Sequence, residues 1–321
     1  MSLINGPQHN SSTNDRCCLA VIFRCGVVAN LAIAFSLCCS GCATLPYSYG
    51  TAHRHDECAE LAAVTGSPIE RGRPNRFLDT VGWIWGIPGK VLLFDRRVEN
   101  HQIGANTEAS IARYLNDNAL NTVKVRINQY HPGDDWRRLV ANKSVGPGWR
   151  YTLGTLSVVA ETLIPGRVFG GDHYNPFTNT VHLYSDIPAI AIHEAGHAKD
   201  FAGRHWKGTY AAAYLIPGVP LYHEARATGD ALGYIRTTGS VQDHKEAYEI
   251  LYPAYGTYVG NAVSGYLPFG YLGGVIGGHI VGRWKSYDLG SHAQSQPANH
   301  KDVQQASYSE EPGFEALPVC D

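Results

Sequence analysis

The sequence predicts an α+β fold, with a small β-sheet packed against helices, because it contains two kinds of periodicity. Residues 122–128 alternate Val123, Val125 and Ile127 with polar side chains, as a strand with one buried face does. Residues 178–184 form a second strand-like run. Elsewhere, and above all after the second run, apolar residues recur at the spacing of helices. We therefore expect a small twisted sheet and a mostly helical C-terminal part.

Helical patterns flank the first of these strands. Residues 106–108 read Asn-Thr-Glu and predict a helix cap ahead of Ile111, Tyr114 and Leu115, whose spacing makes one apolar face. A second, short helix is expected around residues 135–141.

Two further runs are predicted to be strands. Residues 149–156 and 158–163 are rich in β-branched, aromatic and other apolar side chains, with no strong breaker between them. We expect them to form a hairpin or one bent strand. The predicted sheet therefore lies within the segment from residue 122 to residue 184.

A helix is predicted directly after the last strand. Ser185 or Asp186 can cap it, and Pro188 is tolerated in a first turn, where an N–H group has no intrahelical partner. Gly203 is a suitable end for this helix. Residues 193–197 within it read His-Glu-Ala-Gly-His, which is an H-E-x-x-H motif.

The H-E-x-x-H motif predicts a site for one Zn²⁺. His193 and His197 are four residues apart and project from the same helix face, so both imidazoles can reach one ion. Glu194 lies between them and can act as the general base on a metal-bound water. The alternative interpretation is a pair of histidines on a buried or solvated helix face, without a metal.

Together with the strand before it, this motif resembles the zincin metallopeptidases, in which an edge strand pairs with an extended substrate. The metzincin subclass is excluded, because Asp200 and Gly203 stand where it requires Gly and His. The gluzincin subclass takes its third ligand from a Glu on a later helix, and Glu224 supplies one. The resemblance implies a zincin-like fold, a zinc ion held by His193, His197 and Glu224, and hydrolysis of a peptide or protein substrate.

The third ligand has two carboxylate candidates, with His205 and His223 as fallbacks. Gluzincins carry an Asp four residues after the ligand Glu, whereas this chain has Thr228 there and Asp230 two residues further on. Helical geometry places Asp230 on a different face from Glu224. Either Glu224 is the ligand and its surroundings are built differently, or Asp230 is the ligand and Glu224 a surface charge. We favour Glu224.

Three protein ligands leave a fourth position for water, whose pKa zinc lowers towards about 7. Glu194 is expected to take the proton of that water, so that hydroxide attacks a carbonyl. The oxyanion that results needs a hydrogen-bond donor. His223 is the first candidate for that donor, with Tyr234 and Arg226 as further ones.

The N-terminus has the architecture of a signal peptide. Arg16 and Arg24 precede an apolar run over residues 25–39, and residues 39–42 read Cys-Ser-Gly-Cys. This resembles the lipobox of bacterial lipoproteins and implies acylation of Cys42, with the protein anchored in the membrane of the cell envelope and facing the periplasm or the exterior. A single uncleaved membrane-spanning helix is the alternative, since the run and its flanks approach the ~20 residues that cross a bilayer.

Composition divides the chain further. The expected segments are the signal peptide (1–41), a turn-rich tether (42–76), the catalytic domain (77–249), an apolar glycine-rich helical hairpin (250–283) and a polar disordered tail (284–321). Acylation would leave Cys58 and Cys320 in the mature chain. These two can pair in an oxidising compartment, although two free thiols fit the sequence equally well.

The predicted hairpin is unusual in composition. Residues 250–282 carry no Asp, Glu, Lys or Arg, and Gly270, Gly274, Gly278 and Gly282 recur every four residues. Glycines at this spacing form a flat helix face that another backbone can approach closely. A Leu-Pro-Phe-Gly break predicts two helices, each too short to span a bilayer. We expect the hairpin to pack on the catalytic domain, to insert into lipid or to self-associate.

Composition also limits the possible functions. The chain has 321 residues, 17% of them charged, and a formal net charge of -2, which excludes polybasic, collagen-like and mostly disordered proteins. Nucleic acid is therefore not an expected partner. The rival hypothesis is a non-catalytic envelope lipoprotein whose hairpin mediates membrane or protein interaction. Glu194 favours an enzyme, because a structural zinc site is usually closed by four ligands and has no use for a base.

Overall fold

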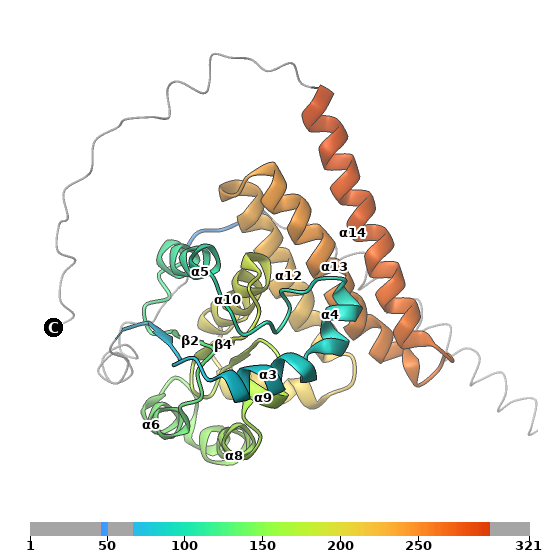
Figure 1. The fold of residues 1–321 in the computed structure, drawn as a ribbon. Helices are drawn as coiled ribbons and strands as arrows, with labels where there is room; N and C mark the ends of the chain where they lie inside the picture. The colour runs from blue at the N-terminus through green and yellow to red at the C-terminus, as the bar shows by residue number, and fades with distance from the viewer. Residues whose placement is uncertain (1–45, 51–66, 296–321) are drawn as a thin grey trace, which may run out of the picture.

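The computed structural model describes residues 46–50 and 67–295 and has a mixed α+β fold, mostly helical, with a small four-stranded sheet (Figure 1). The strands are β1 (Ile69–Arg71), β2 (Lys124–Ile127), β3 (His173–Asn175) and β4 (Thr180–Leu183). The predicted signal peptide, Cys42, Cys58 and Cys320 lie outside the described residues, so lipidation and the disulfide stay predictions.

Helices surround the sheet and make up the C-terminal half. Those before β4 are α3 (Arg76–Trp85), α4 (Ile87–Leu93), α5 (Ala105–Asp117), α6 (Pro132–Ala141), α7 (Pro147–Trp149), the π-helical turn η2 (Arg150–Gly154), α8 (Thr155–Leu163) and α9 (Gly166–Phe169). Those after β4 are α10 (Pro188–Ala202), α11 (Lys207–Ala212), the 3-10 turn η3 (Ala213–Leu215), α12 (Val219–Thr238), α13 (Val241–Ser264) and α14 (Gly270–Ser295).

The sheet has the order β1-β2-β4-β3. β1 and β4 each pair in parallel with β2, whereas β3 pairs antiparallel with β4 and forms one edge. The strands predicted at 122–128 and 178–184 are confirmed as β2 and β4, and β1 and β3 are additional. β4, the strand directly before α10, is an inner strand, so the edge on that side of the sheet is β3.

Both faces of β2 and β4 are buried, whereas the alternation in β2 predicted one buried face. One face is apolar and belongs to the main core together with α5 and α10; its members are Val125, Ile127, Val181 and Leu183. The other face is polar and equally buried; its members are Lys124, Arg126, Thr180 and His182. Helix α6 explains this burial, because its Asp134 and Asp135 accept hydrogen bonds from Arg126. A charged side chain is buried when partners of opposite charge satisfy it.

The strands predicted at 149–156 and 158–163 are wrong, because the segment folds as α7, η2 and α8. The apolar run has no alternation that would distinguish a strand from a buried helix. As a helix it presents Val158 to a small core with Leu139 and Phe177 and directs Leu156 and Leu163 to the surface. The short helix expected at 135–141 is confirmed as part of α6.

Predicted helices at 106 and 188 are confirmed, but their expected caps are wrong. α5 begins after Gly104, and Thr107 donates its hydroxyl to Asp186 instead of capping. α10 begins after Ile187, with Pro188 in its first turn as expected, while Ser185 donates to Asp172. These polar groups connect separate segments of the chain instead of satisfying their own helices. The end of α10 at Gly203 agrees with the sequence.

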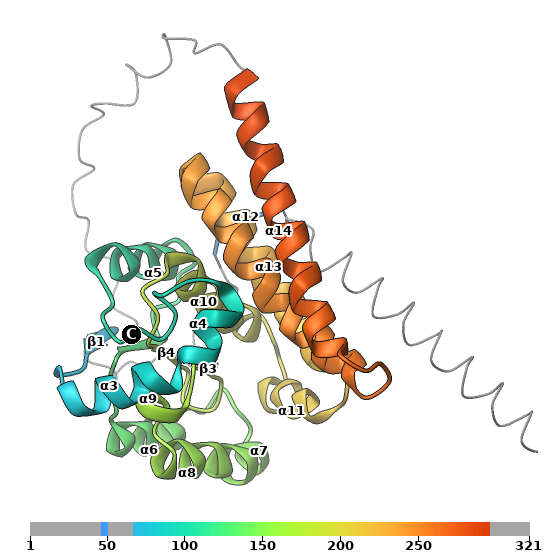
Figure 2. The same ribbon diagram turned by 45° about the vertical axis from the view of Figure 1, so that its right-hand side comes forward.

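The C-terminal hairpin consists of α13 and α14, which lie side by side (Figures 1 and 2). The break predicted near Pro268 is confirmed, but the helices have 24 and 26 residues and extend beyond the expected 250–283. Residues 284–295 are helical, which corrects the expectation of a tail that is disordered from residue 284 onward.

The α14 glycines that recur every four residues, from Gly270 to Gly282, face α13. A Cβ added at Gly278 or Gly282 would lie 2.5 Å from the carbonyl oxygen of Tyr252 or Tyr248, respectively. The regular glycine spacing therefore serves close helix packing within the chain. Among the described residues, no helix is both long and apolar enough to cross a bilayer.

Candidate metal centre

Two helices meet at the H-E-x-x-H motif. α10 carries His193 and His197 on one face, and α12 brings Glu224 opposite them. His193 Nε2 lies 3.1 Å from Glu224 Oε2, and His197 Nε2 lies 3.5 Å from Glu224 Oε1. One ligand atom from each of the three residues lies within 4.8 Å of the others. The structure thus brings together the three residues that the sequence proposed as ligands.

Small residues let the two helices approach. Gly196 lies between the motif histidines, and a Cβ added to it would lie 3.2 Å from the carbonyl oxygen and 3.4 Å from the Cα of Ala227 on α12. Those atoms are backbone, so a larger side chain at residue 196 would have to move α12 itself. The motif's own glycine therefore helps to set the distance between Glu224 and the histidines.

The donor set fits a zinc ion. Burial alone would raise the pKa of Glu224, but the neighbouring His197 and His193 outweigh it and hold that pKa well below its usual range. Glu224 is therefore a carboxylate at neutral pH. Two imidazole nitrogens and one carboxylate oxygen are the three protein ligands typical of one class of catalytic zinc site.

The outer nitrogen of His193 has its own contact. Thr228 Oγ1 lies 3.4 Å from His193 Nδ1, on the helix that also carries Glu224. Thr228 follows Glu224 by four residues, which is about one helical turn, so a neutral hydroxyl lies beside the histidine. Groups that contact the outer nitrogen of a histidine ligand orient its ring and tune its affinity for metal.

Glu194 lies beside this cluster with a shifted pKa. It lines a cavity of about 310 Å³ together with His197 and Glu224. Burial raises the pKa of Glu194 to about 7, although the nearby His193 opposes the shift. A carboxyl group with a pKa near neutrality can both accept and return a proton at physiological pH, which a general base must do.

Two tyrosines complete the wall of the cavity, and sequence analysis missed both. The Tyr214 hydroxyl donates to Glu224 Oε1 over 3.5 Å, and the Tyr258 hydroxyl also bonds to Glu224. Burial is the largest cause of the raised pKa of Tyr214, and the charge of Glu224 is the second. For Tyr258 the charge of Glu224 is the largest cause of the raised pKa, and burial is the second. Both hydroxyls therefore stay protonated and able to donate. They come from η3 and α13, so no local motif indicates them.

His223, the predicted transition-state donor, lies next to Glu224 in the chain and packs among aromatic rings. Its ring packs between those of Tyr210 and Tyr214, with centroid distances of 4.1 Å to each. Burial lowers its pKa to about 4, so it is neutral. It is not among the described residues that line the cavity. His223 thus packs behind Tyr214, and its role as a transition-state donor stays a prediction.

Asp230, Arg226 and Tyr234 are separate from the histidine pair. Asp230 bonds to Lys199 Nζ at 2.7 Å and to the Tyr114 hydroxyl, and with Arg226 it lines a different pocket. Tyr234 belongs to the main core, where its hydroxyl bonds to α5. The geometry therefore favours Glu224 over Asp230 as the third ligand.

Comparison with known proteins adds no further constraint. No family model, curated protein or solved structure matches this chain. The interpretation of the cluster therefore rests on the residues and the geometry of this chain.

Proposed function

We propose that the protein is a zinc-dependent hydrolase, and specifically a zincin-like metallopeptidase. His193, His197 and Glu224 would bind its one catalytic Zn²⁺. The observation that carries this proposal is the convergence of these three side chains beside a cavity that Glu194 also lines. Two histidines alone would suit a structural site, but a buried glutamate with a pKa of about 7 beside them suits catalysis.

A zinc ion at this site would act as a Lewis acid and lower the pKa of water towards about 7. Glu194 accepts the proton of the attacking water and afterwards passes it to the leaving amine. The raised pKa of Glu194 matches this exchange, since a stronger acid would hold the proton too weakly to return it efficiently at neutral pH.

The tetrahedral oxyanion requires donors that are already in place. The hydroxyls of Tyr214 and Tyr258 meet this need, because each is protonated and each lies against Glu224 at the wall of the cavity. In this proposal they turn from the carboxylate towards the oxyanion when substrate is present. They replace His223 in that role.

The substrate class follows from the position of the sheet edge. β3 pairs with β4 on one side only, and its residues His173 and Tyr174 line the same cavity as Glu194. The outer edge of a strand offers backbone donors and acceptors to an extended chain. A peptide segment lying along β3 would present its carbonyl groups to the cluster, so we propose a peptide or protein substrate.

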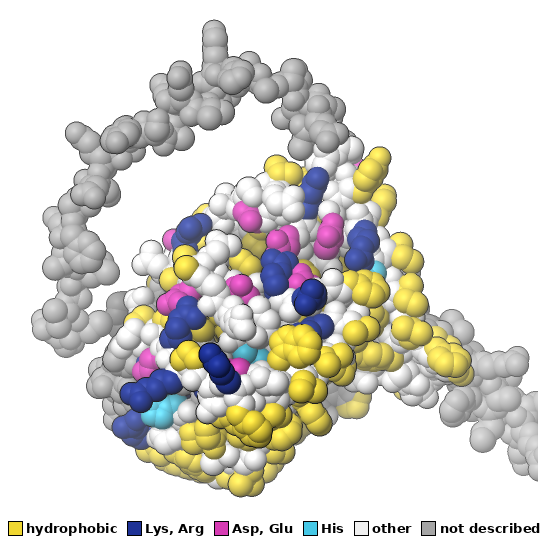
Figure 3. Space-filling view, in the orientation of Figure 1, with side chains coloured by type: hydrophobic (Ala, Val, Ile, Leu, Met, Phe, Trp, Pro, Cys, Tyr) yellow, Lys and Arg dark blue, Asp and Glu magenta, His cyan; other side chains and the backbone are white. Residues whose placement is uncertain are grey.

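We further propose that the protein acts at a membrane of the bacterial cell envelope, attached through acylated Cys42. One surface of α14 supports contact with lipid, since exposed apolar side chains recur along it at helical spacing: Ile276, Ile280, Trp284 and Tyr287 are 49%, 65%, 63% and 77% exposed. Hydrophobic side chains gather along the edge of the molecule that α14 forms (Figure 3). Such a row suits the plane of a membrane surface.

The same row supports a second candidate function, a non-catalytic lipoprotein whose hairpin mediates membrane or protein interaction. The two candidates differ in what they require of Glu194. Only the hydrolase needs a carboxylate there, whereas zinc binding without turnover needs only the three ligands.

The test compares the full-length chain, purified in detergent and loaded with zinc, with its Glu194→Gln variant on a library of fluorogenic peptides. We expect the variant to keep its zinc and to lose 10²–10⁴-fold in kcat, as loss of a general base does. Glu246→Gln, whose carboxylate pairs with Arg97 away from the cavity, is the matched control and should keep full activity. Absence of hydrolysis by the zinc-loaded wild type, or equal rates for the two chains, would support the non-catalytic alternative.

A further inference from the structure

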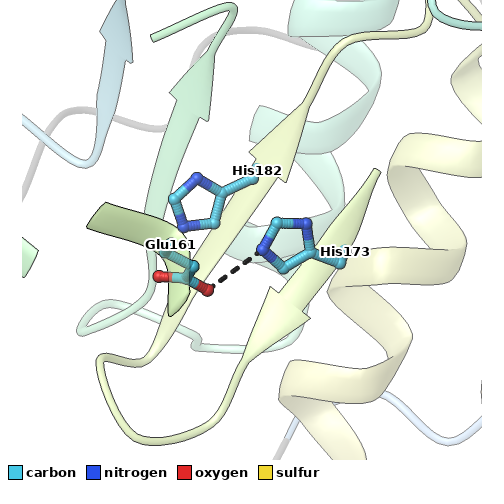
Figure 4. Close-up of side chains that lie close together, drawn as sticks. All are labelled: Glu161, His173 and His182. Atoms are coloured by element: carbon cyan, nitrogen blue, oxygen red, sulfur yellow. Dashed lines mark hydrogen bonds and ion pairs between the residues drawn. The ribbon is translucent and has the colours of Figure 1, made fainter. Parts of the chain in front are cut away.

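A second cluster of metal-ligating side chains lies on the polar face of the sheet. Glu161 of α8, His173 of β3 and His182 of β4 turn toward one another (Figure 4). One ligand atom from each lies within 4.8 Å of the others, and His173 Nε2 lies 3.2 Å from Glu161 Oε1. The two histidines face each other across the β3–β4 pair, and their rings stack with centroids 4.6 Å apart.

Two atoms of this cluster are buried without a partner. His182 is only 5% exposed, and its Nε2 has no hydrogen-bond partner among the described residues. The same holds for Glu161 Oε2. A buried polar atom that is left unpaired costs roughly 1–3 kcal/mol. Two such atoms in one cluster point to a ligand that would satisfy both.

We propose that Glu161, His173 and His182 bind a second divalent transition-metal ion, of the class of Zn²⁺. Imidazole nitrogen and carboxylate oxygen are the donors that such ions accept. The donor set equals that of the candidate catalytic centre, but the two sites share no residue. The proposal therefore stands whether or not the protein hydrolyses peptides.

The surroundings of the cluster orient its donors as a metal site requires. His173 Nδ1 lies 2.9 Å from the carbonyl oxygen of Gly171, and a hydrogen bond there leaves Nε2 free to act as a ligand. Asn175 Nδ2 donates to Glu161 Oε1 over 2.8 Å and fixes the carboxylate. Both ligands are thus held in place by groups outside the cluster.

Nearby charges permit a cation here. Arg126 lies on the same face of the sheet, but its guanidinium bonds to Asp134 at 2.6 Å and to Asp135 at 3.0 Å, which offsets its charge. Arg138, also on this side, donates to the carbonyl oxygen of Thr178. Among the described residues, neither arginine bonds to Glu161, so its carboxylate is available to the cluster.

The ion would hold the edge of the sheet. It would join α8 to the hydrogen-bonded pair of strands β3 and β4. His173 also lines the cavity beside Glu194. We therefore expect the second ion to position the strand along which the peptide of the proposed function would lie.

The simpler alternative is an ion pair between Glu161 and a protonated His173, with His182 neutral beside it. That arrangement satisfies His173 but leaves His182 Nε2 and Glu161 Oε2 unpartnered. The two interpretations differ in metal content, which is directly measurable.

The experiment counts zinc ions per chain in the full-length protein after loading with Zn²⁺ and removal of excess. The wild type should hold two ions, His182→Asn one and His193→Ala one. His244→Asn is the matched control and should hold two. His244 is also buried, its Nε2 has no partner among the described residues, and it belongs to neither of the two clusters. Two ions in His182→Asn would overturn the proposal.

A second measurement covers variants that fold poorly. In a His193→Ala chain stripped of metal, added Zn²⁺ should still raise the melting temperature, and Glu161→Gln, which keeps an acceptor for Asn175, should abolish that rise. An unchanged rise in the double variant, or none in His193→Ala itself, would contradict a second site. Failure of the hydrolase proposal would leave these results unaffected.

Discussion

Replacing neighbouring glycines of α14 with alanine should change stability in opposite directions. A Cβ at Gly278 would lie 2.5 Å from the carbonyl oxygen of Tyr252 and 2.6 Å from the Cα of Pro253, both backbone atoms of α13. At Gly277 the added carbon would meet nothing within 4 Å. One substitution therefore forces α13 and α14 apart, and the other leaves their packing unchanged.

The magnitude follows from two effects. Replacing Gly with Ala inside a helix gains about 1 kcal/mol of helix propensity, which both variants share. Overpacking costs typically about 1–3 kcal/mol, and we expect the upper end for Gly278→Ala because backbone atoms cannot rotate out of the way. Gly277→Ala should thus be about 1 kcal/mol more stable than the wild type, and Gly278→Ala about 2 kcal/mol less stable.

The assay is equilibrium unfolding of the full chain by guanidinium chloride, followed by far-UV circular dichroism. The difference between the two variants isolates the helix contact, since the propensity gain cancels. Equal free energies of unfolding, or a less stable Gly277→Ala, would refute the packing of α14 on α13 through its glycine face.

Three further predictions concern the candidate metal centre. Thr228→Val should weaken zinc binding about 10- to 100-fold by removing the contact to the outer nitrogen of His193. An unchanged Kd in zinc titration would show that this contact does not contribute to zinc affinity. In the metal-free chain the raised pKa of Glu194 means that its protonated form stabilises the fold below pH 4.5, and that this contribution is lost as pH rises through about 7. Relative to Glu194→Gln, the wild type should therefore lose about 3 kcal/mol of unfolding free energy across that range, measured by denaturation at each pH. If the unfolding free energies of the two chains changed with pH in parallel, the pKa of Glu194 would not be raised. Tyr214→Phe and Tyr258→Phe should each lower kcat up to about 10²-fold with little change in zinc content, and wild-type kcat in both would exclude them as oxyanion donors.

The sequence predicts the parts of the site that depend on local spacing. The positions of His193, Glu194 and His197 on one helix follow from a four-residue repeat, and Glu224 follows from a second helical pattern downstream. Such local patterns predict the structure correctly, because the helix period determines which side chains share a face. The α+β class was predicted on the same basis.

The remaining features depend on tertiary contacts. Tyr214 and Tyr258 reach the cavity from η3 and α13, which are distant from the motif in sequence. Thr107 and Ser185 were assigned to caps, but partners elsewhere in the chain take their hydroxyls. No spacing rule encodes such pairings, since they arise only after the elements pack.

Residues 149–163 show a different limit. Their apolar side chains fit a strand by composition, and a run without alternation does not separate a strand from a helix. In the structure the run is helical, and α8 places Glu161 beside two histidines of the sheet. The strand prediction did not contain this arrangement. The proposed second metal site therefore could not be predicted from the sequence.

The most direct test of the central claim is X-ray diffraction from zinc-loaded crystals of the full chain, recorded on both sides of the zinc absorption edge. The account predicts an anomalous peak about 2.0–2.2 Å from His193 Nε2, His197 Nε2 and a carboxylate oxygen of Glu224. Loss of that peak in His193→Ala crystals would confirm the assignment. Well-ordered wild-type crystals with no zinc between these three residues would contradict it.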